Sequence, residues 1–191
     1  RFPPMPDGSD ALYFCGHSLG LMPKRSQEIL NEEMEKWATH GVRGHMSGER
    51  PWVSIDEKLE PPMAAVVGAK RSEVCVMNSL TVNLHLLLTP FWRPKGDRKI
   101  LLFEDRCFSS DYYAFCSFAE AQGWDPNEVV VPVHNNEQGN SLPPTTEDIL
   151  WAIQKHGEEL AVVCIGAVQF FSGEYYDIEA IVKAAHEVRQ K

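Results

Sequence analysis

A run of hydroxyl and amide side chains, residues 78–83, stands between two apolar stretches. Residues 73–77 before it are short and apolar, like a buried strand, and the leucines after it recur at helical spacing. We therefore expect a strand-to-helix turn in which Ser79 or Thr81 caps the helix. Free amides, hydroxyls and the positive end of the helix dipole at such a turn suit a phosphate or carboxylate. An ordinary helix cap explains the same residues.

Two further loops carry aromatic and acidic side chains directly after apolar runs. One follows residues 99–104 and contains Phe108 and Asp111, and the other spans residues 169–173. Because ligands of open α/β sheets bind at the carboxyl ends of the strands, we expect all three loops to converge there. An anion site, an aromatic face and a carboxylate suit a flat, phosphorylated ring with a basic nitrogen. Pyridoxal phosphate (PLP) is such a molecule.

The elements that position these loops alternate along the chain. After a Pro- and Gly-rich arm over residues 1–24, an amphipathic pattern predicts a helix that Gly41 ends. Buried strands alternating with helices indicate an α/β fold with a mainly parallel sheet and flanking helices. Besides the first strand-to-helix turn, the sequence predicts strands over residues 99–104, 129–133 and 160–168 and helices over 25–39, 55–67, 111–121, 146–156 and 176–189.

Composition excludes several classes of protein. With 191 residues, 43% of them apolar, the chain is long enough for one packed α/β domain. Its net charge of -9 and scattered basic residues argue against nucleic acid or an anionic membrane as partner. No apolar run is long enough to span a membrane, the first residues lack the basic segment and apolar core that are typical of a signal peptide, and the five cysteines form no CxxC pair. We therefore expect a cytoplasmic protein with reduced, mostly structural thiols.

The motifs of three other enzyme or binding classes are absent or misplaced. No glycine-rich nucleotide loop follows any strand, and His40 and His45 lack the spacing and companions of a metal site. We therefore expect no bound metal. Residues 16–20 match the GxSxG pattern of a serine hydrolase, but they lie in the Pro-rich arm instead of between a strand and a helix. We interpret that match as coincidental.

Four separated segments carry residues of distinctive type: residues 13–24, residues 44–45 with 50–52, residues 77–87, and Phe108 with Ser110 and Asp111. Together they resemble the kynureninase family, in the order in which the family has them. The family is PLP-dependent and normally homodimeric, and it hydrolyses kynurenine and 3-hydroxykynurenine to anthranilate or 3-hydroxyanthranilate and alanine, in tryptophan catabolism and NAD biosynthesis. The resemblance implies the large domain of fold-type I PLP enzymes, incomplete over residues 51–191, with residues 1–50 as an N-terminal arm and helix.

The same resemblance implies roles for individual residues. Asp111 matches the acidic residue beside the cofactor and is the candidate catalytic group. Alone, Asp111 is equally explained as a helix N-cap, Phe108 as core packing and His45 as a solvated loop residue. The expected cofactor contacts are Leu80 and Thr81 with the phosphate, Phe108 stacked on the ring, and Asp111; the expected substrate contacts are Ser18 and His45.

The sequence also departs from the family pattern. His17 stands where the family commonly has Asn, and Gly166 stands where it commonly has a hydroxyl residue that contacts the phosphate. The Asp and His of the following strand and the Schiff-base lysine have no match among these residues. We therefore expect a fragment that is inactive alone. The alternative is a non-catalytic kynureninase-like module that binds PLP or dimerises with a complete subunit.

Overall fold

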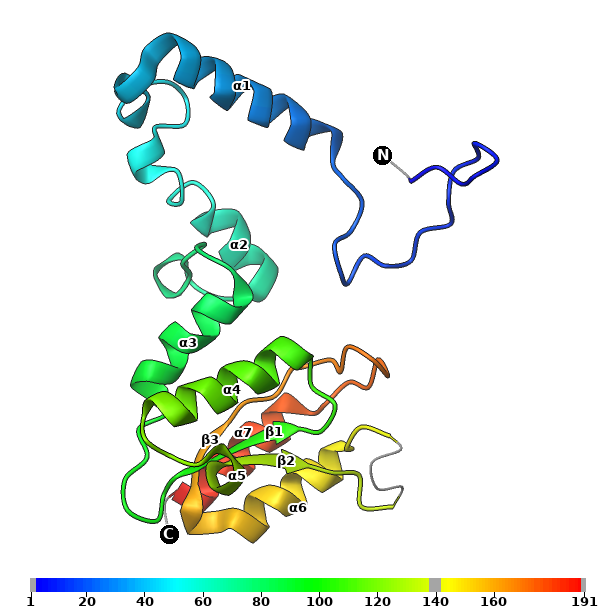
Figure 1. The fold of residues 1–191 in the computed structure, drawn as a ribbon, viewed down its shortest axis with the longest axis vertical. Helices are drawn as coiled ribbons and strands as arrows, with labels where there is room; N and C mark the ends of the chain where they lie inside the picture. Colours follow the sequence, from blue (N-terminus) through cyan, green and yellow to red (C-terminus); the bar gives the residue numbers. More distant parts are fainter. Residues whose placement is uncertain (1–2, 138–141, 190–191) are drawn as a thin grey trace. The chain divides into compact units, whose positions relative to one another are not determined.

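The chain divides into two compact units in the computed structural model, which describes residues 3–137 and 142–189 (Figure 1). The units are Arg1–Met77 and Asn78–Lys191. The expected division into an arm and helix over residues 1–50 and a cofactor-binding part over residues 51–191 stays a prediction.

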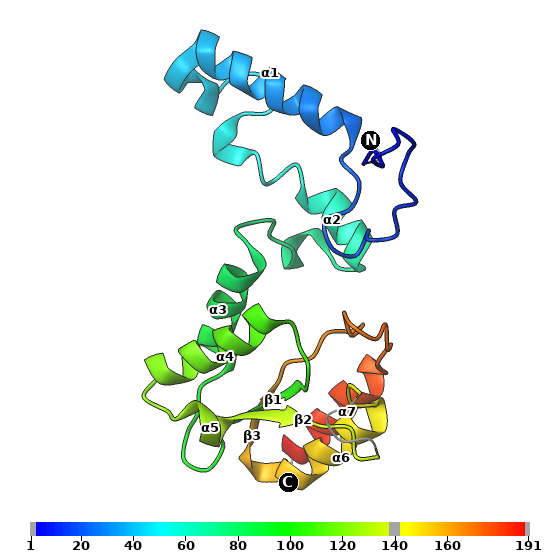
Figure 2. The same ribbon diagram turned by 45° about the vertical axis from the view of Figure 1, so that its right-hand side comes forward.

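The first unit contains helices joined by short turns (Figure 2). Helix α1 ends at Gly41, whose φ of 53° closes it as predicted. The second predicted helix begins later than expected, at Glu60. The prolines in its first turn are tolerated because proline lacks an amide hydrogen, and first-turn amides have no helical partner in any case. The bounds are α1 Lys24–His40, α2 Glu60–Val67, and the 3-10 helices η1 Gly41–His45, η2 Trp52–Ser54 and η3 Arg71–Glu73.

A three-stranded parallel sheet forms the centre of the second unit, which confirms the predicted α/β class. Its strands are β1 Ile100–Glu104, β2 Val130–Val133 and β3 Leu160–Val163, in the order β2-β1-β3. Leu102 of β1 is aligned with Val131 of β2 and with Val163 of β3. The strand predicted over residues 73–77 is wrong, because these residues join no sheet and Cys75 and Met77 are exposed.

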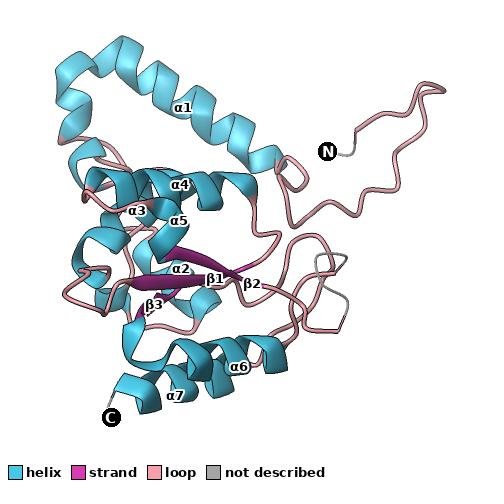
Figure 3. Cartoon of the chain, turned by 60° about the horizontal axis from the view of Figure 1, so that its bottom comes forward, coloured by secondary structure: helices cyan, strands magenta, loops and turns pink. Residues whose placement is uncertain are grey.

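The side chains of β1 alternate between two cores, one on each face of the sheet. Ile100 and Leu102 pack in a cluster with residues of α6 and α7, and Leu101 and Phe103 pack in a second cluster with residues of α3, α4 and α5. Figure 3 shows α4 on one side of the strands and α6 and α7 on the other. The helices are α3 Leu80–Phe91, α4 Ser109–Ala121, α5 Pro126–Val129, α6 Thr146–His156 and α7 Ile178–Arg189.

A capping box forms the N-terminus of α6. Thr145 Oγ1 accepts a hydrogen bond from the Asp148 amide, and the Asp148 carboxylate accepts one from the Thr145 amide. This cap fixes the residue at which α6 begins.

Within the described residues, no helix combines the length and the apolar composition needed to cross a membrane.

Candidate cofactor and substrate site

The turn before α3 presents free backbone donors, as its sequence predicts. Asn78 has a φ of 46°, and Ser79 is the N-cap in an extended conformation without a side-chain capping bond. The helical ladder starts with the Asn83 amide donating to the Ser79 carbonyl at 2.9 Å. The amides of the first turn, including those of Leu80 and Thr81, therefore precede the ladder and point out of the helix end. The alternative that Thr81 is the cap is wrong.

The loops that follow β1 and β3 meet through two aromatic rings. Phe108 is the N-cap residue of α4, and its ring lies 5.2 Å from the ring of Phe170 at an interplanar angle of 70°. This contact confirms that these two predicted loops converge. Phe108 is 51% exposed, so the core-packing interpretation is wrong. Sequence reasoning included Phe170 in its loop but gave it no role.

A buried glutamine joins the backbones of the same two loops. Gln169 is 1% exposed, and its Nε2 donates to the Arg106 carbonyl at 2.8 Å. Its Oε1 accepts from the amides of Phe171 and Ser172 at 2.6 and 2.9 Å. A buried amide with all these partners holds both loops in place. The sequence signal for this role was weak, because Gln169 is only the first polar residue after a long apolar run.

Asp111 lies in the first turn of α4, not at its N-cap. The structure corrects the capping interpretation, because Phe108 is the N-cap residue. The Phe108 carbonyl accepts a hydrogen bond from the Asp111 amide at 2.9 Å. Ser110 Oγ donates to Asp111 Oδ1 at 3.3 Å, and the Asp111 side chain is half-buried. A carboxylate in a first turn is stabilised by the helix dipole. Asp111 therefore places a carboxyl group at the same sheet edge as Phe108.

Glu104, the last residue of β1, is a buried acid that sequence reasoning counted only as the end of a strand. It is 8% exposed, and burial raises the pKa of its carboxyl to about 7, although the backbone amide of Gly166 donates to it. A Cβ atom at Gly166 would lie 3.7 Å from Glu104 Oε1, an ordinary contact. The Gly166 departure therefore leaves room beside Glu104 that a hydroxyl side chain would fill.

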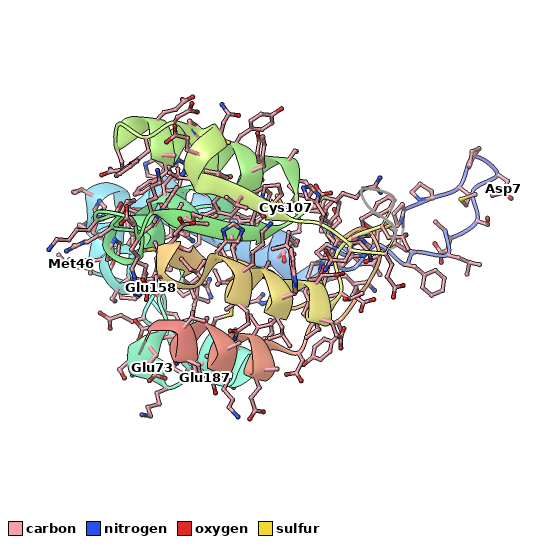
Figure 4. All side chains as sticks on the ribbon, turned by 90° about the horizontal axis from the view of Figure 1, so that it is seen from below. Asp7, Met46, Glu73, Cys107, Glu158 and Glu187 are labelled. Atoms are coloured by element: carbon pink, nitrogen blue, oxygen red, sulfur yellow. The ribbon has the colours of Figure 1, made fainter. Side chains whose placement is uncertain are left out.

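The thiol nearest these groups is not a nucleophile. Cys107 lies in the loop after β1 (Figure 4), and burial raises the pKa of its thiol to about 12. The thiol therefore stays protonated near neutral pH, when only the thiolate is reactive. Burial also raises the pKa of Cys164. Both agree with the expected structural role of the cysteines.

Ser18 and His45, the expected substrate contacts, belong to the first unit. Ser18 is exposed in a turn, where its amide donates to the Cys15 carbonyl at 3.1 Å, and His17 is exposed beside it. His45 is the exposed last residue of η1, with its ring 5.3 Å from that of Trp52 at 90°. Their position relative to Phe108 stays a prediction.

The serine-hydrolase and metalloenzyme alternatives gain no support. The GxSxG match over residues 16–20 forms an exposed turn with neither a strand before it nor a helix directly after it. A nucleophile elbow needs both. Among the described residues, no group of three or more His, Cys, Asp or Glu side chains could hold a metal ion.

Comparison with known proteins tests the resemblance over the whole sequence. The chain is 42% identical over 185 residues to the kynureninase of Christiangramia forsetii and 44% identical over 186 residues to that of Myxococcus xanthus, each match covering 97% of the chain. It is 43% identical over 178 residues to the kynureninase of Nematostella vectensis. The similarity to the kynureninase family is thereby shown. No protein-family model matches the chain.

The similarity to kynureninases covers nearly all of this chain but less than half of each relative. The matches cover 43%, 43% and 38% of the three relatives named. The chain therefore spans about two-fifths of the length of the kynureninases that it matches.

Proposed function

We propose that the protein carrying this chain is a kynureninase, which hydrolyses kynurenine or 3-hydroxykynurenine to alanine and anthranilate or 3-hydroxyanthranilate. The observation that carries this proposal is the 42% to 44% identity, over almost the whole chain, to proteins named kynureninase. The proposal includes PLP as cofactor, a homodimer, a cytoplasmic location, a role in tryptophan catabolism and NAD biosynthesis, and the fold-type I large domain for the second unit.

The residues of the second unit fit PLP by their chemistry. The amides at the start of α3 and the Thr81 hydroxyl would donate to the phosphate, with Leu80 supplying a backbone amide. The half-exposed ring of Phe108 would stack on the flat face of the pyridine, and the edge contact with Phe170 would hold the Phe108 ring in its orientation. PLP, when bound, supplies the electron sink for breaking bonds at the amino-acid carbon.

The acids of this edge would serve as proton-handling groups. Asp111 is held in the first turn of α4 beside Phe108, where it can orient the cofactor or a proton donor.

Ser18 and His45 would contact the amino acid or its aromatic ring from the first unit. These two assignments rest on the family resemblance, and their side chains are exposed enough to accept a ligand.

The exposure and ion pairs of the lysines favour a second candidate function for the chain by itself, that of a non-catalytic module. Covalent attachment of PLP needs a lysine whose amine is desolvated enough to act as a nucleophile. Within the described residues, no lysine is buried; Lys36 and Lys99 are half-buried but pair with Glu33 and Glu128. The chain alone would therefore bind PLP without turnover or contribute to a dimer.

The test uses the complete product of the gene, loaded with PLP and given kynurenine. We expect kynurenine to be consumed and alanine to be released in equal amounts. A product that retains PLP but consumes no kynurenine or 3-hydroxykynurenine would contradict the proposal. The isolated chain of 191 residues is the matched comparison, and turnover by that chain would overturn the non-catalytic alternative.

A further inference from the structure

The densest side-chain network of the first unit is centred on Glu33 of α1. Its Oε1 accepts from Arg50 Nε at 2.7 Å, and its Oε2 accepts from Trp52 Nε1 at 2.7 Å and from Lys36 Nζ at 2.5 Å. Lys36 also donates to the Arg50 carbonyl at 2.6 Å. Arg50 and Trp52 lie 17 and 19 residues beyond Glu33 in the chain. One carboxylate thus ties the segment after η1 back to the helix.

The hydrogen-bond partners of Glu33 stabilise its ionised form. Hydrogen bonds from Lys36, Trp52 and Arg50, in that order of effect, lower the pKa of Glu33 to about 2. The bonds to Glu33 and Glu32 raise the pKa of Arg50. Glu33 is therefore ionised throughout the physiological range, and a neutral replacement would weaken charge-assisted bonds.

Trp52, held by this network, is the neighbour of the turn that carries His45. Its indole ring lies edge-on to the His45 ring, 5.3 Å away, with Lys36 Nζ 4.8 Å from an indole ring centroid. The other side of the contact is the backbone of Gly44. A Cβ atom at Gly44 would lie 2.5 to 2.9 Å from three atoms of the Trp52 ring, closer than real Cβ atoms approach. Gly44 therefore allows the indole to reach the backbone directly beside His45.

The His45 ring has few other restraints. The residue is exposed, and in the described part of the chain its ring contacts Trp52 and accepts or donates no hydrogen bond. An imidazole at the end of a short 3-10 helix would otherwise exchange among several rotamers. The direction of the His45 ring thus depends on where Trp52 is held.

We propose that Glu33 and Trp52 are positioning residues that orient His45 for binding the substrate. The indole, anchored by Glu33 and seated on Gly44, fixes the imidazole without touching the substrate itself. This inference rests on the proposed function, because it takes His45 as a substrate contact. It adds three residues, Glu33, Gly44 and Trp52, to the determinants of substrate affinity.

The kinetic test compares Trp52→Leu, Trp52→Phe and Glu33→Gln in the complete gene product. Trp52→Leu removes the ring, and we expect the KM for kynurenine to rise about tenfold. The values of kcat and of PLP affinity should change less than twofold, because the binding energy is lost equally in the ground state and the transition state. Trp52→Phe keeps a ring beside His45 but loses the donor to Glu33, so it should restore part of the affinity. Glu35→Gln is the control, because Glu35 is an exposed neighbour on α1 with no side-chain bond.

A second measurement needs no turnover. In nuclear magnetic resonance spectra, the Trp52 ring current should displace His45 ring protons from the position of an exposed histidine. Trp52→Leu should abolish this displacement, Glu33→Gln should reduce it, and Glu35→Gln should leave it unchanged. A wild-type product inactive on kynurenine would defeat the proposed function, yet these spectra would still test the positioning. Unchanged His45 resonances in Trp52→Leu or an unchanged KM would overturn the inference. A rise in KM accompanied by a comparable loss of kcat and of PLP affinity would overturn it as well.

Discussion

Glu104 shows how one residue at the end of a strand can make stability depend on pH. It occupies the last position of β1, where the alternation of side chains would place it in a core. Desolvation disfavours its charged form, and the amide of Gly166 compensates only in part. The sequence shows an acid after four apolar residues, but only the packing shows that it is buried.

Glu104→Gln should remove this pH dependence. The folded-state pKa of about 7 lies above the unfolded value of 4.5, so the contribution of the group to stability is complete below pH 4.5 and is lost as pH rises through 7. Between pH 5 and pH 8, the free energy of unfolding of the wild-type chain should fall relative to the variant by at most about 3 kcal/mol. Urea unfolding at both values measures the difference. Parallel pH profiles for wild type and variant would contradict the prediction; Glu120→Gln, an exposed change on α4, is the control.

At the scale of elements, local signals in the sequence predicted most of the second unit. The runs that form β1 and β2 and the helix α6 are located where the sequence indicates. The run 160–168 was predicted too long, because only its first four residues form β3. Residues 73–77 have the composition of a strand but no partner in a sheet, and pairing is a property of tertiary structure that propensity does not contain.

The capping box of α6 gives a graded prediction. Thr145→Ala removes one side-chain acceptor and should lower the free energy of unfolding by about 1 kcal/mol. Asp148→Ala should cost about 2 to 3 kcal/mol, because the buried carboxylate also accepts from the amide of Asn136 at 3.1 Å, which would lose its partner. Denaturant unfolding at constant pH measures both. Equal losses for the two variants, or none, would show that the cap does not determine the stability of α6; Glu147→Ala, exposed in the same turn, is the control.

At the scale of the whole molecule, the resemblance supplied what local patterns could not. Hydroxyl residues, a loop phenylalanine and a first-turn acid are common separately, and only their joint order indicated one cofactor. The structure brings the loops of Phe108 and Phe170 together and leaves the start of α3 open. Gln169 and Glu104, which organise that edge, have no sequence signature, because their roles depend on residues more than sixty positions away.

Binding of PLP by the complete gene product tests the assembled site. Phe108→Ala should weaken PLP affinity about tenfold through lost stacking. Thr81→Ala should weaken it about tenfold or more, because a hydroxyl bonded to a charged group contributes about 1.5 to 3 kcal/mol. Equilibrium dialysis measures both. Matched controls are Tyr113→Ala, an exposed aromatic of α4, and Thr89→Ala, a hydroxyl at the other end of α3. PLP affinity that survives either site change would remove that residue from the cofactor site.

The strand order β2-β1-β3 has one further consequence. From β1 the chain crosses by α4 to β2 on one side, and from β2 it returns by α6 past β1 to β3 on the other. The two crossings run in opposite directions and place their helices on opposite faces, so β1 and β3 form a topological switch point. The chain leaves β1 toward α4 on one face and β3 toward α7 on the other, and Phe108 and Phe170, one from each loop, stay in contact where these two paths part.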